Sequence, residues 1–77
     1  MRADIIVAVS RYAGKKYRTR ANLGDDVPIV PMDEEEISHI PNGSVVAVVG
    51  DPGTRAQHDA VLAMSTRVQF GELKAAI

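Results

Sequence analysis

The sequence predicts a small α+β domain with a β-hairpin, a third central strand and two or three short helices. The chain has 77 residues, so we expect a single globular domain, 1–77. Two apolar runs, Ile5–Val9 and Val45–Val49, have the composition of buried strands. Elsewhere, helix-capping residues precede apolar positions at helical spacing. The alternative fold is a small all-β barrel, in which residues 60–70 form a strand.

The first predicted element is the β-hairpin. Residues 4–10 form a buried strand, and Gly14 provides the turn because glycine accepts positive φ. In residues 16–23 charged and less polar side chains alternate, which is typical of a strand with one exposed face. A three-residue loop gives the register that keeps the apolar side chains of both strands on one face. On the other face this register gathers a basic stripe of four residues: Tyr12, Lys16, Arg18 and Arg20.

A short acidic helix is predicted next. Asp33 is a good N-cap, and Glu36, three residues later, completes a capping box. Met32 and Ile37 take the positions of a hydrophobic staple. The glutamates lie at the positive end of the helix dipole, so a helix start explains them better than a partner site does.

The third strand is Val45–Val49, and the segment after it allows two interpretations. Thr54 begins a second capping box, and the residues that follow are good helix formers. Residues 62–70, however, also alternate as a strand would. The helix is preferred, with a short extended piece at 67–70 and a last helical turn or two at 71–77.

Charge is unevenly divided along the chain. Residues 1–24 hold six basic residues and one acidic residue, a net +5. Residues 25–77 hold three basic and nine acidic residues, a net −6, and the two sum to the formal charge of −1. This asymmetry indicates a charged partner for the basic part.

A second surface is expected to mediate self-association. Both faces of the first and third strands are apolar, and the predicted helices cover only one of them well. An uncovered apolar face marks an interaction site, so we expect a homodimer. The face consists of Ile6, Ala8, Val46 and Val48.

Few patterns in this chain fit enzyme chemistry. There is no cysteine, and His39 and His58 have no neighbour at metal-ligand spacing. Residues 45–54 resemble the strand-to-helix start of a phosphate-binding loop, but Arg55 and Ala56 stand where that motif needs glycine and lysine. We therefore predict no catalytic residue, no cofactor, no metal and no enzyme activity.

Composition and the length of the apolar runs indicate the expected location. The apolar fraction of 45% and the charged fraction of 25% are typical of a soluble folded domain. The apolar runs are too short to span a membrane, and no apolar segment of signal-peptide length follows the N-terminus. A cytoplasmic protein without a membrane partner is expected.

The predicted function is that of a small non-enzymatic protein-interaction module, an accessory or inhibitory subunit of a larger assembly that binds its partner through the basic stripe. The alternative is a nucleic-acid-binding regulator that uses the basic hairpin 11–20. Cations two residues apart on a strand are about 7 Å apart, which approaches the spacing of phosphates. An isoelectric point of about 6.0 argues against strong nucleic-acid binding, so a protein partner is preferred.

Overall fold

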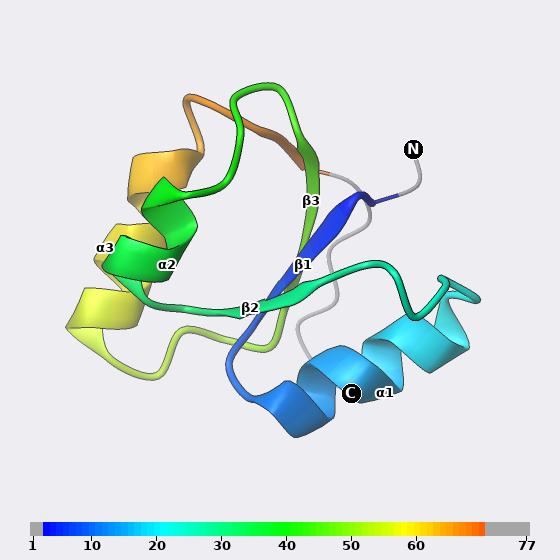
Figure 1. The fold of residues 1–77 in the computed structure, drawn as a ribbon. Coiled ribbons are helices and arrows are strands. Elements are labelled where there is room, and N and C mark those ends of the chain that lie inside the picture. The colour runs from blue at the N-terminus through cyan, green and yellow to red at the C-terminus, as the bar shows by residue number, and fades with distance from the viewer. Residues whose placement is uncertain (1–2, 71–77) are drawn as a thin grey trace.

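The computed structural model describes residues 3–70, in which parallel strands alternate with helices in one open sheet (Figure 1). The elements are β1 (Ile5–Ala8), α1 (Arg11–Arg20), β2 (Ile29–Pro31), α2 (Glu34–Ser38), β3 (Val45–Val49), α3 (Arg55–Met64) and β4 (Gln69–Phe70). The strand order is β2-β1-β3-β4. The predicted α+β class is confirmed, and the barrel alternative is wrong because the sheet does not close. The helical turns predicted at 71–77 lie outside the described residues.

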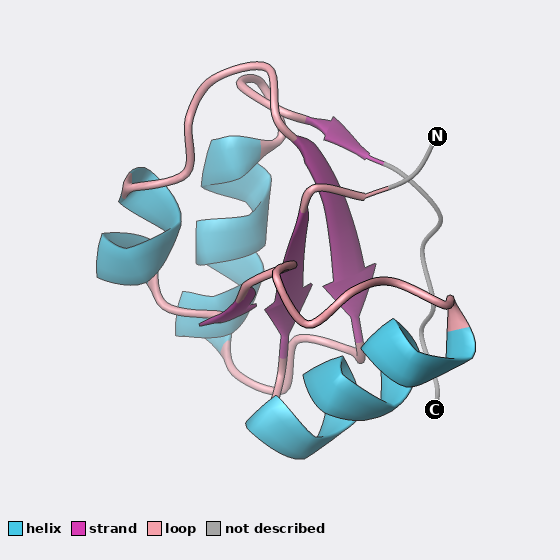
Figure 2. Cartoon of the chain, turned by 45° about the vertical axis from the view of Figure 1, so that its right-hand side comes forward, coloured by secondary structure: helices cyan, strands magenta, loops and turns pink. Residues whose placement is uncertain are grey.

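The sheet is the middle of three layers (Figures 1 and 2). Helix α1 covers one face, and α2 and α3 cover the other. In the strand order, the connection from β1 to β2 leads toward one edge of the sheet. The connections from β2 to β3 and from β3 to β4 lead toward the opposite edge. Because such crossovers are right-handed, they place their helices on opposite faces. Both faces of β1 and β3 are therefore covered, which explains why these strands are apolar throughout.

The register of β1 with β3 decides which side chains meet in each layer. Ile6 is the partner of Ala47, and Val7 is the partner of Val48. The buried cluster under α1 consists of Ala3, Ile6, Ala8, Tyr17, Val27, Ala47 and Val49. The buried cluster under α2 and α3 consists of Val7, Met32, Ile37, Ile40, Val46, Ala60, Met64 and Val68. Two small apolar clusters, one on each face, thus hold the layers together.

The predicted hairpin is wrong, because residues 11–20 form helix α1. Ser10 is its N-cap, and the Ser10 Oγ accepts a hydrogen bond from the Ala13 amide at 3.1 Å. Gly14 does not turn the chain but lies against the sheet, where an added Cβ would come within 2.6 Å of Ile29 Cγ2. The strands on either side of α1 are parallel, and parallel neighbours need a crossover connection rather than a tight turn.

The helices predicted on the other face are confirmed. The Asp33 Oδ1 accepts hydrogen bonds from two amides in the first turn of α2, at 2.9 and 3.4 Å. The backbone amide of Asp33 donates to the Pro31 carbonyl at 2.8 Å, instead of to Glu36 as a capping box would require. The capping box of α3 is complete between Thr54 and Gln57. The extended piece predicted after α3 is β4.

Two glycines with positive φ allow a matched test of packing at the end of β3. Gly50 has φ +89°, and a Cβ there would lie 2.5 Å from Val9 Cγ2. Gly43 has φ +86° and nothing within 4 Å of that position. We expect each alanine substitution to cost about 1–2 kcal/mol of backbone strain. Gly50→Ala should cost about 1–3 kcal/mol more, because it also overpacks against Val9.

Urea unfolding measures the loss in free energy of unfolding for Gly50→Ala and for Gly43→Ala. In a Val9→Ala background the difference between Gly50→Ala and Gly43→Ala should disappear. Equal losses in the parent background would contradict the packing of Val9 on Gly50.

The cap of α2 gives a second stability prediction. Asp33→Ala removes the acceptor for the first-turn amides and should lower the free energy of unfolding by about 0.5–2 kcal/mol. Asp33→Asn keeps a side-chain oxygen and should stay within a few tenths of a kcal/mol of the parent. Thermal or urea unfolding of the pair decides the matter, and equal stability of the two variants would show that the cap contributes nothing.

Candidate functional site

Helix α1 rearranges the basic stripe that the sequence predicted. Residues four apart lie on the same side of a helix, so Tyr12, Lys16 and Arg20 form one row along α1. The Lys16 Nζ lies 5.8 Å from the centroid of the Tyr12 ring. Arg18 is two residues from Lys16 and from Arg20, and therefore lies on another side of the helix. The structure brings together three residues of the stripe and separates the fourth.

The row of three belongs to a wider surface, which we call the α1 outer face. Lys15 and Thr19 join Tyr12, Lys16 and Arg20 around a shallow, open hollow of about 450 Å³. Tyr12 is 74% exposed, an uncommon position for a large aromatic side chain. Lys15 and Thr19 are not part of the stripe predicted for a strand, although both stand at helical spacing from the row and helix periodicity would have included them.

The positive charge of the α1 outer face is not neutralised by residues 3–70. Within residues 3–70 the ion pairs join Arg18 to Asp25 and Arg55 to Asp59, and the His58 Nδ1 lies 3.9 Å from an Asp59 carboxylate oxygen. Helix α1 itself contains no acidic residue that could form an i,i+4 pair with the cations. The face is thus cationic, exposed and open to an acidic group from another molecule.

Arg18 differs from the other cations of α1, because its guanidinium makes contacts within the chain. Its Nη1 donates a hydrogen bond to the Val27 carbonyl at 3.0 Å, and its Nη2 lies 3.8 Å from an Asp25 carboxylate oxygen. Only 18% of the Arg18 side chain is exposed. These contacts connect α1 to the loop that leads to β2, so Arg18 does not belong to the α1 outer face.

The four residues expected to form a self-association face lie on two different faces. Ile6 and Ala8 are buried under α1, whereas Val46 is buried under α2 and α3. Val48 is half-buried and packs against the same cluster as Val46. The helices supply the cover that was expected from a second copy. The reason for expecting a homodimer through these four residues is therefore removed.

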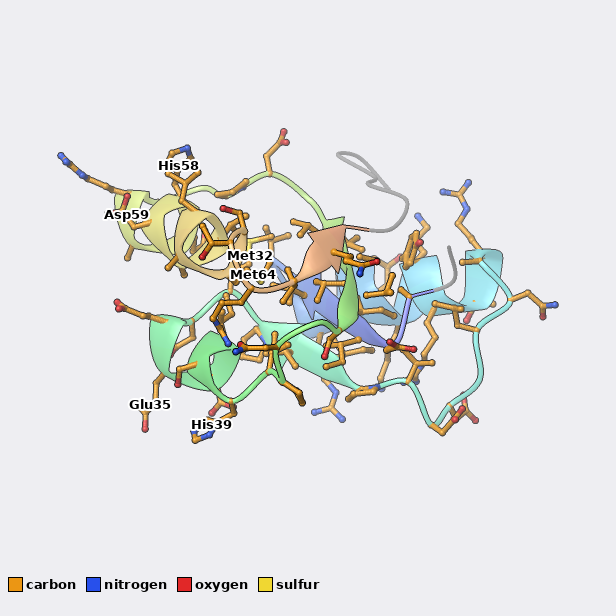
Figure 3. All side chains as sticks on the ribbon, turned by 90° about the horizontal axis from the view of Figure 1, so that it is seen from above. Met32, Glu35, His39, His58, Asp59 and Met64 are labelled. Atoms are coloured by element: carbon orange, nitrogen blue, oxygen red, sulfur yellow. The ribbon has the colours of Figure 1, made fainter. Side chains whose placement is uncertain are left out.

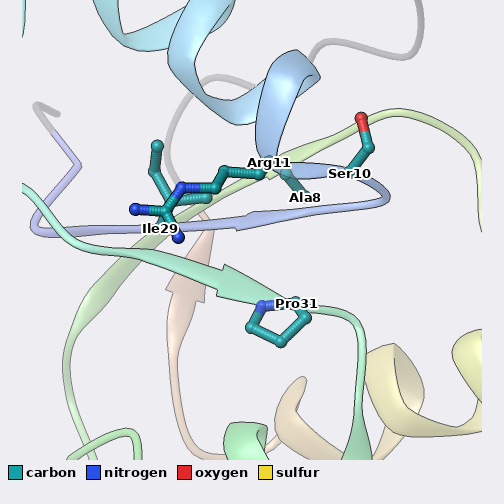
Figure 4. Close-up of a pocket in the computed structure, with 5 residues that line it drawn as sticks. All are labelled: Ala8, Ser10, Arg11, Ile29 and Pro31. Atoms are coloured by element: carbon teal, nitrogen blue, oxygen red, sulfur yellow. The ribbon is translucent and has the colours of Figure 1, made fainter.

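The carboxyl ends of the parallel strands meet at one edge of the sheet, where open sheets of this kind often bind ligands. The chain leaves β1 and β3 toward opposite faces there, but the Val9 side chain packs against Gly50 at this point. A cavity of about 230 Å³ lies between the ends of β1 and β2. It is lined by Ala8, Ser10, Arg11, Ile29 and Pro31 (Figure 4). The cavity is smaller than typical cofactor pockets.

Two pairs of side chains with acid–base or metal-binding chemistry lie at α2 and α3. Glu35 and His39 point away from α2, whereas His58 and Asp59 point away from α3 on the other side of this layer (Figure 3). Within residues 3–70 no three His, Asp or Glu side chains form a group that could hold a metal ion. In the same range no helix has the length and apolar character needed to cross a membrane.

Comparison with known proteins does not identify a family. No protein-family model, curated protein or solved structure matches the chain.

Arg18 is largely buried, whereas Lys16 and Arg20 are exposed, and this difference gives a stability prediction. Arg18→Gln removes a charged hydrogen bond to a part-buried carbonyl and should lower the free energy of unfolding by about 1–3 kcal/mol. The double variant Lys16→Gln/Arg20→Gln changes only exposed side chains and should stay within about 0.5 kcal/mol of the parent. Glutamine is chosen because its helix propensity is close to that of lysine and arginine. Urea unfolding compares the two, and equal losses would show that Arg18 is as solvated as the others.

Proposed function

We propose that this chain is a non-enzymatic interaction module that binds an acidic protein segment through the α1 outer face. In this role it would act as an accessory or inhibitory subunit of a larger assembly. The observation that supports the proposal most is the exposed ring of Tyr12 beside three cations, Lys15, Lys16 and Arg20. No carboxylate of residues 3–70 lies within ion-pairing distance of these cations.

The composition of the face favours a protein partner. Tyrosine and arginine contribute more than most residues to the energy of protein interfaces. The aliphatic stems of lysine and arginine add apolar surface beneath their charged ends. The hollow between these side chains offers a place for an apolar group of the partner. An acidic segment with one apolar side chain would complement all three features.

Nucleic acid fits the molecule less well. Ten helical residues span about 15 Å, so α1 alone reaches few phosphates. The formal net charge of the whole chain is −1, and the exposed acidic residues of α2 would repel an extended phosphate backbone. A nucleic-acid-binding regulator is therefore the alternative function, and the experiment that follows distinguishes it from the proposed one.

The test measures the affinity of two labelled probes by fluorescence anisotropy. One probe is a glutamate-rich peptide that contains one leucine, and the other is a single-stranded oligonucleotide of equal formal charge. We expect Lys16→Gln/Arg20→Gln to weaken peptide binding about tenfold or more. Arg55→Glu lowers the net charge by the same two units at a site outside the face, and should change peptide binding less than about twofold. Tyr12→Ser should weaken binding without changing its salt dependence, since it removes no charge.

Equal losses of peptide affinity in Lys16→Gln/Arg20→Gln and in Arg55→Glu would show that net charge drives binding. That result would overturn the proposal. Tighter binding of the oligonucleotide than of the peptide would also overturn it. In that case the log–log salt slope should flatten by roughly 1.4 in Lys16→Gln/Arg20→Gln, which is about 0.7 for each lost contact to a single strand. That result would support the nucleic-acid-binding alternative.

A further inference from the structure

A second charged surface lies across the sheet from α1. The first turn of α2 and its cap present four exposed acidic residues, which we call the α2 acidic face: Asp33, Glu34, Glu35 and Glu36. Among the ion pairs of residues 3–70, none involves these carboxylates. Glu34 also borders an open hollow of about 360 Å³ between α2 and α3, which is lined by Glu34, Ile37, Ser38, Ala63 and Arg67.

The arginine in this hollow does not neutralise the α2 acidic face, because its guanidinium is used elsewhere. Arg67 donates to the carbonyls of Ile40 and Ile37, at 2.9 and 3.1 Å, and to the Asn42 Oδ1 at 3.1 Å. These bonds satisfy backbone acceptors at the end of α2 and beyond it. The α2 acidic face is left with like charges close together, which repel one another.

The two charged faces are complementary to each other. The α1 outer face combines an exposed aromatic ring with cations that have no ion-pair partner among residues 3–70. The α2 acidic face combines a hollow between two helices with carboxylates that likewise lack an ion-pair partner in that range. The sheet separates the two faces within one molecule (Figures 1 and 2). Neither face can therefore neutralise the other in the same chain, whereas contact between two chains would relieve the repulsion on both sides.

We propose that the acidic partner of the α1 outer face is the α2 acidic face of a second copy of this chain. The inference rests on the proposed function and names its partner. In this contact the cations Lys16 and Arg20 lie near the glutamates of the other copy, and the Tyr12 ring lies at the mouth of the hollow between its α2 and α3. The contact is head-to-tail, so each copy keeps one face free and further copies add to an open chain or close a ring.

The contact is expected to be weak and salt-dependent. Because the contact joins only short helices, we expect it to bury less than the roughly 1,000 Å² that stable interfaces exceed. The charges on both faces are exposed, so salt screens their attraction. Self-association should therefore appear at high protein concentration in low salt and decline as salt is added.

Complementation between two variants tests the head-to-tail geometry by sedimentation velocity. The first variant, Tyr12→Ser/Lys16→Gln/Arg20→Gln, lacks the α1 outer face. The second, Glu34→Gln/Glu35→Gln/Glu36→Gln, lacks the glutamates but keeps the Asp33 cap. We expect each variant alone to self-associate at least about tenfold more weakly than the parent. The equimolar mixture should form a heterodimer that does not grow, because it holds only one working pair of faces.

A matched control separates the α2 acidic face from net charge. Asp26→Asn/Asp51→Asn/Asp59→Asn removes three exposed carboxylates elsewhere, as the second variant does on α2. This control should self-associate at least as well as the parent. Circular dichroism of each variant confirms that the helices remain formed.

The remaining outcomes overturn the inference in distinguishable ways. A parent chain that stays monomeric in low salt but binds the acidic peptide would overturn the inference and leave the proposed function standing. A chain that neither self-associates nor binds the peptide would overturn both. Variants that still associate alone, or that fail to complement each other while the parent associates, would place self-association on another surface.

Discussion

The structure depends on two central strands that are apolar on both faces. In β1 and β3 the side chains of Ile6, Val7, Val46 and Val49 are all fully buried, although they point to opposite sides of the sheet. Strands of this kind are stable only when helices cover both faces. The right-handed connections supply that cover, α1 on one side and α2 with α3 on the other. The positions of α1, α2 and α3 follow from that requirement.

The surface chemistry follows from the same requirement. Helix α1 turns Gly14 and Tyr17 toward the sheet, so the residues on its opposite side, Tyr12 and Lys16, must face solvent. The absence of a Cβ at Gly14 lets the helix approach Ile29 closely. Because the sheet stands between α1 and α2, the cations of one helix and the carboxylates of the other remain apart. A domain of slightly negative net charge thus presents two strong and opposite local charges.

Elements defined by local patterns could be predicted, and those defined by distant pairing could not. The caps at Asp33 and Thr54 and the apolar strand Val45–Val49 depend on neighbours in sequence, and the structure confirms them. Parallel pairing joins β1 to segments far along the chain, and no local pattern specifies it. Gly14 suits both a turn and a close helix–sheet contact, so its identity alone did not distinguish the two. A strand at residues 11–20 leaves the expected cover of the sheet one helix short.

Three of the four residues of the predicted basic stripe nevertheless lie on one side of α1, and the reason is geometric. A spacing of four residues is even, so it keeps side chains on one face of a strand, and it is also close to one helical turn. Tyr12, Lys16 and Arg20 therefore share a side in either structure, whereas Arg18, at a spacing of two, shares it only in a strand. Residues an odd number of positions apart distinguish a helix from a strand, because a strand places them on opposite faces. Ala13 and Tyr17 pack toward the sheet one turn apart with Gly14 between them, a pattern that a helix satisfies and an alternating strand does not.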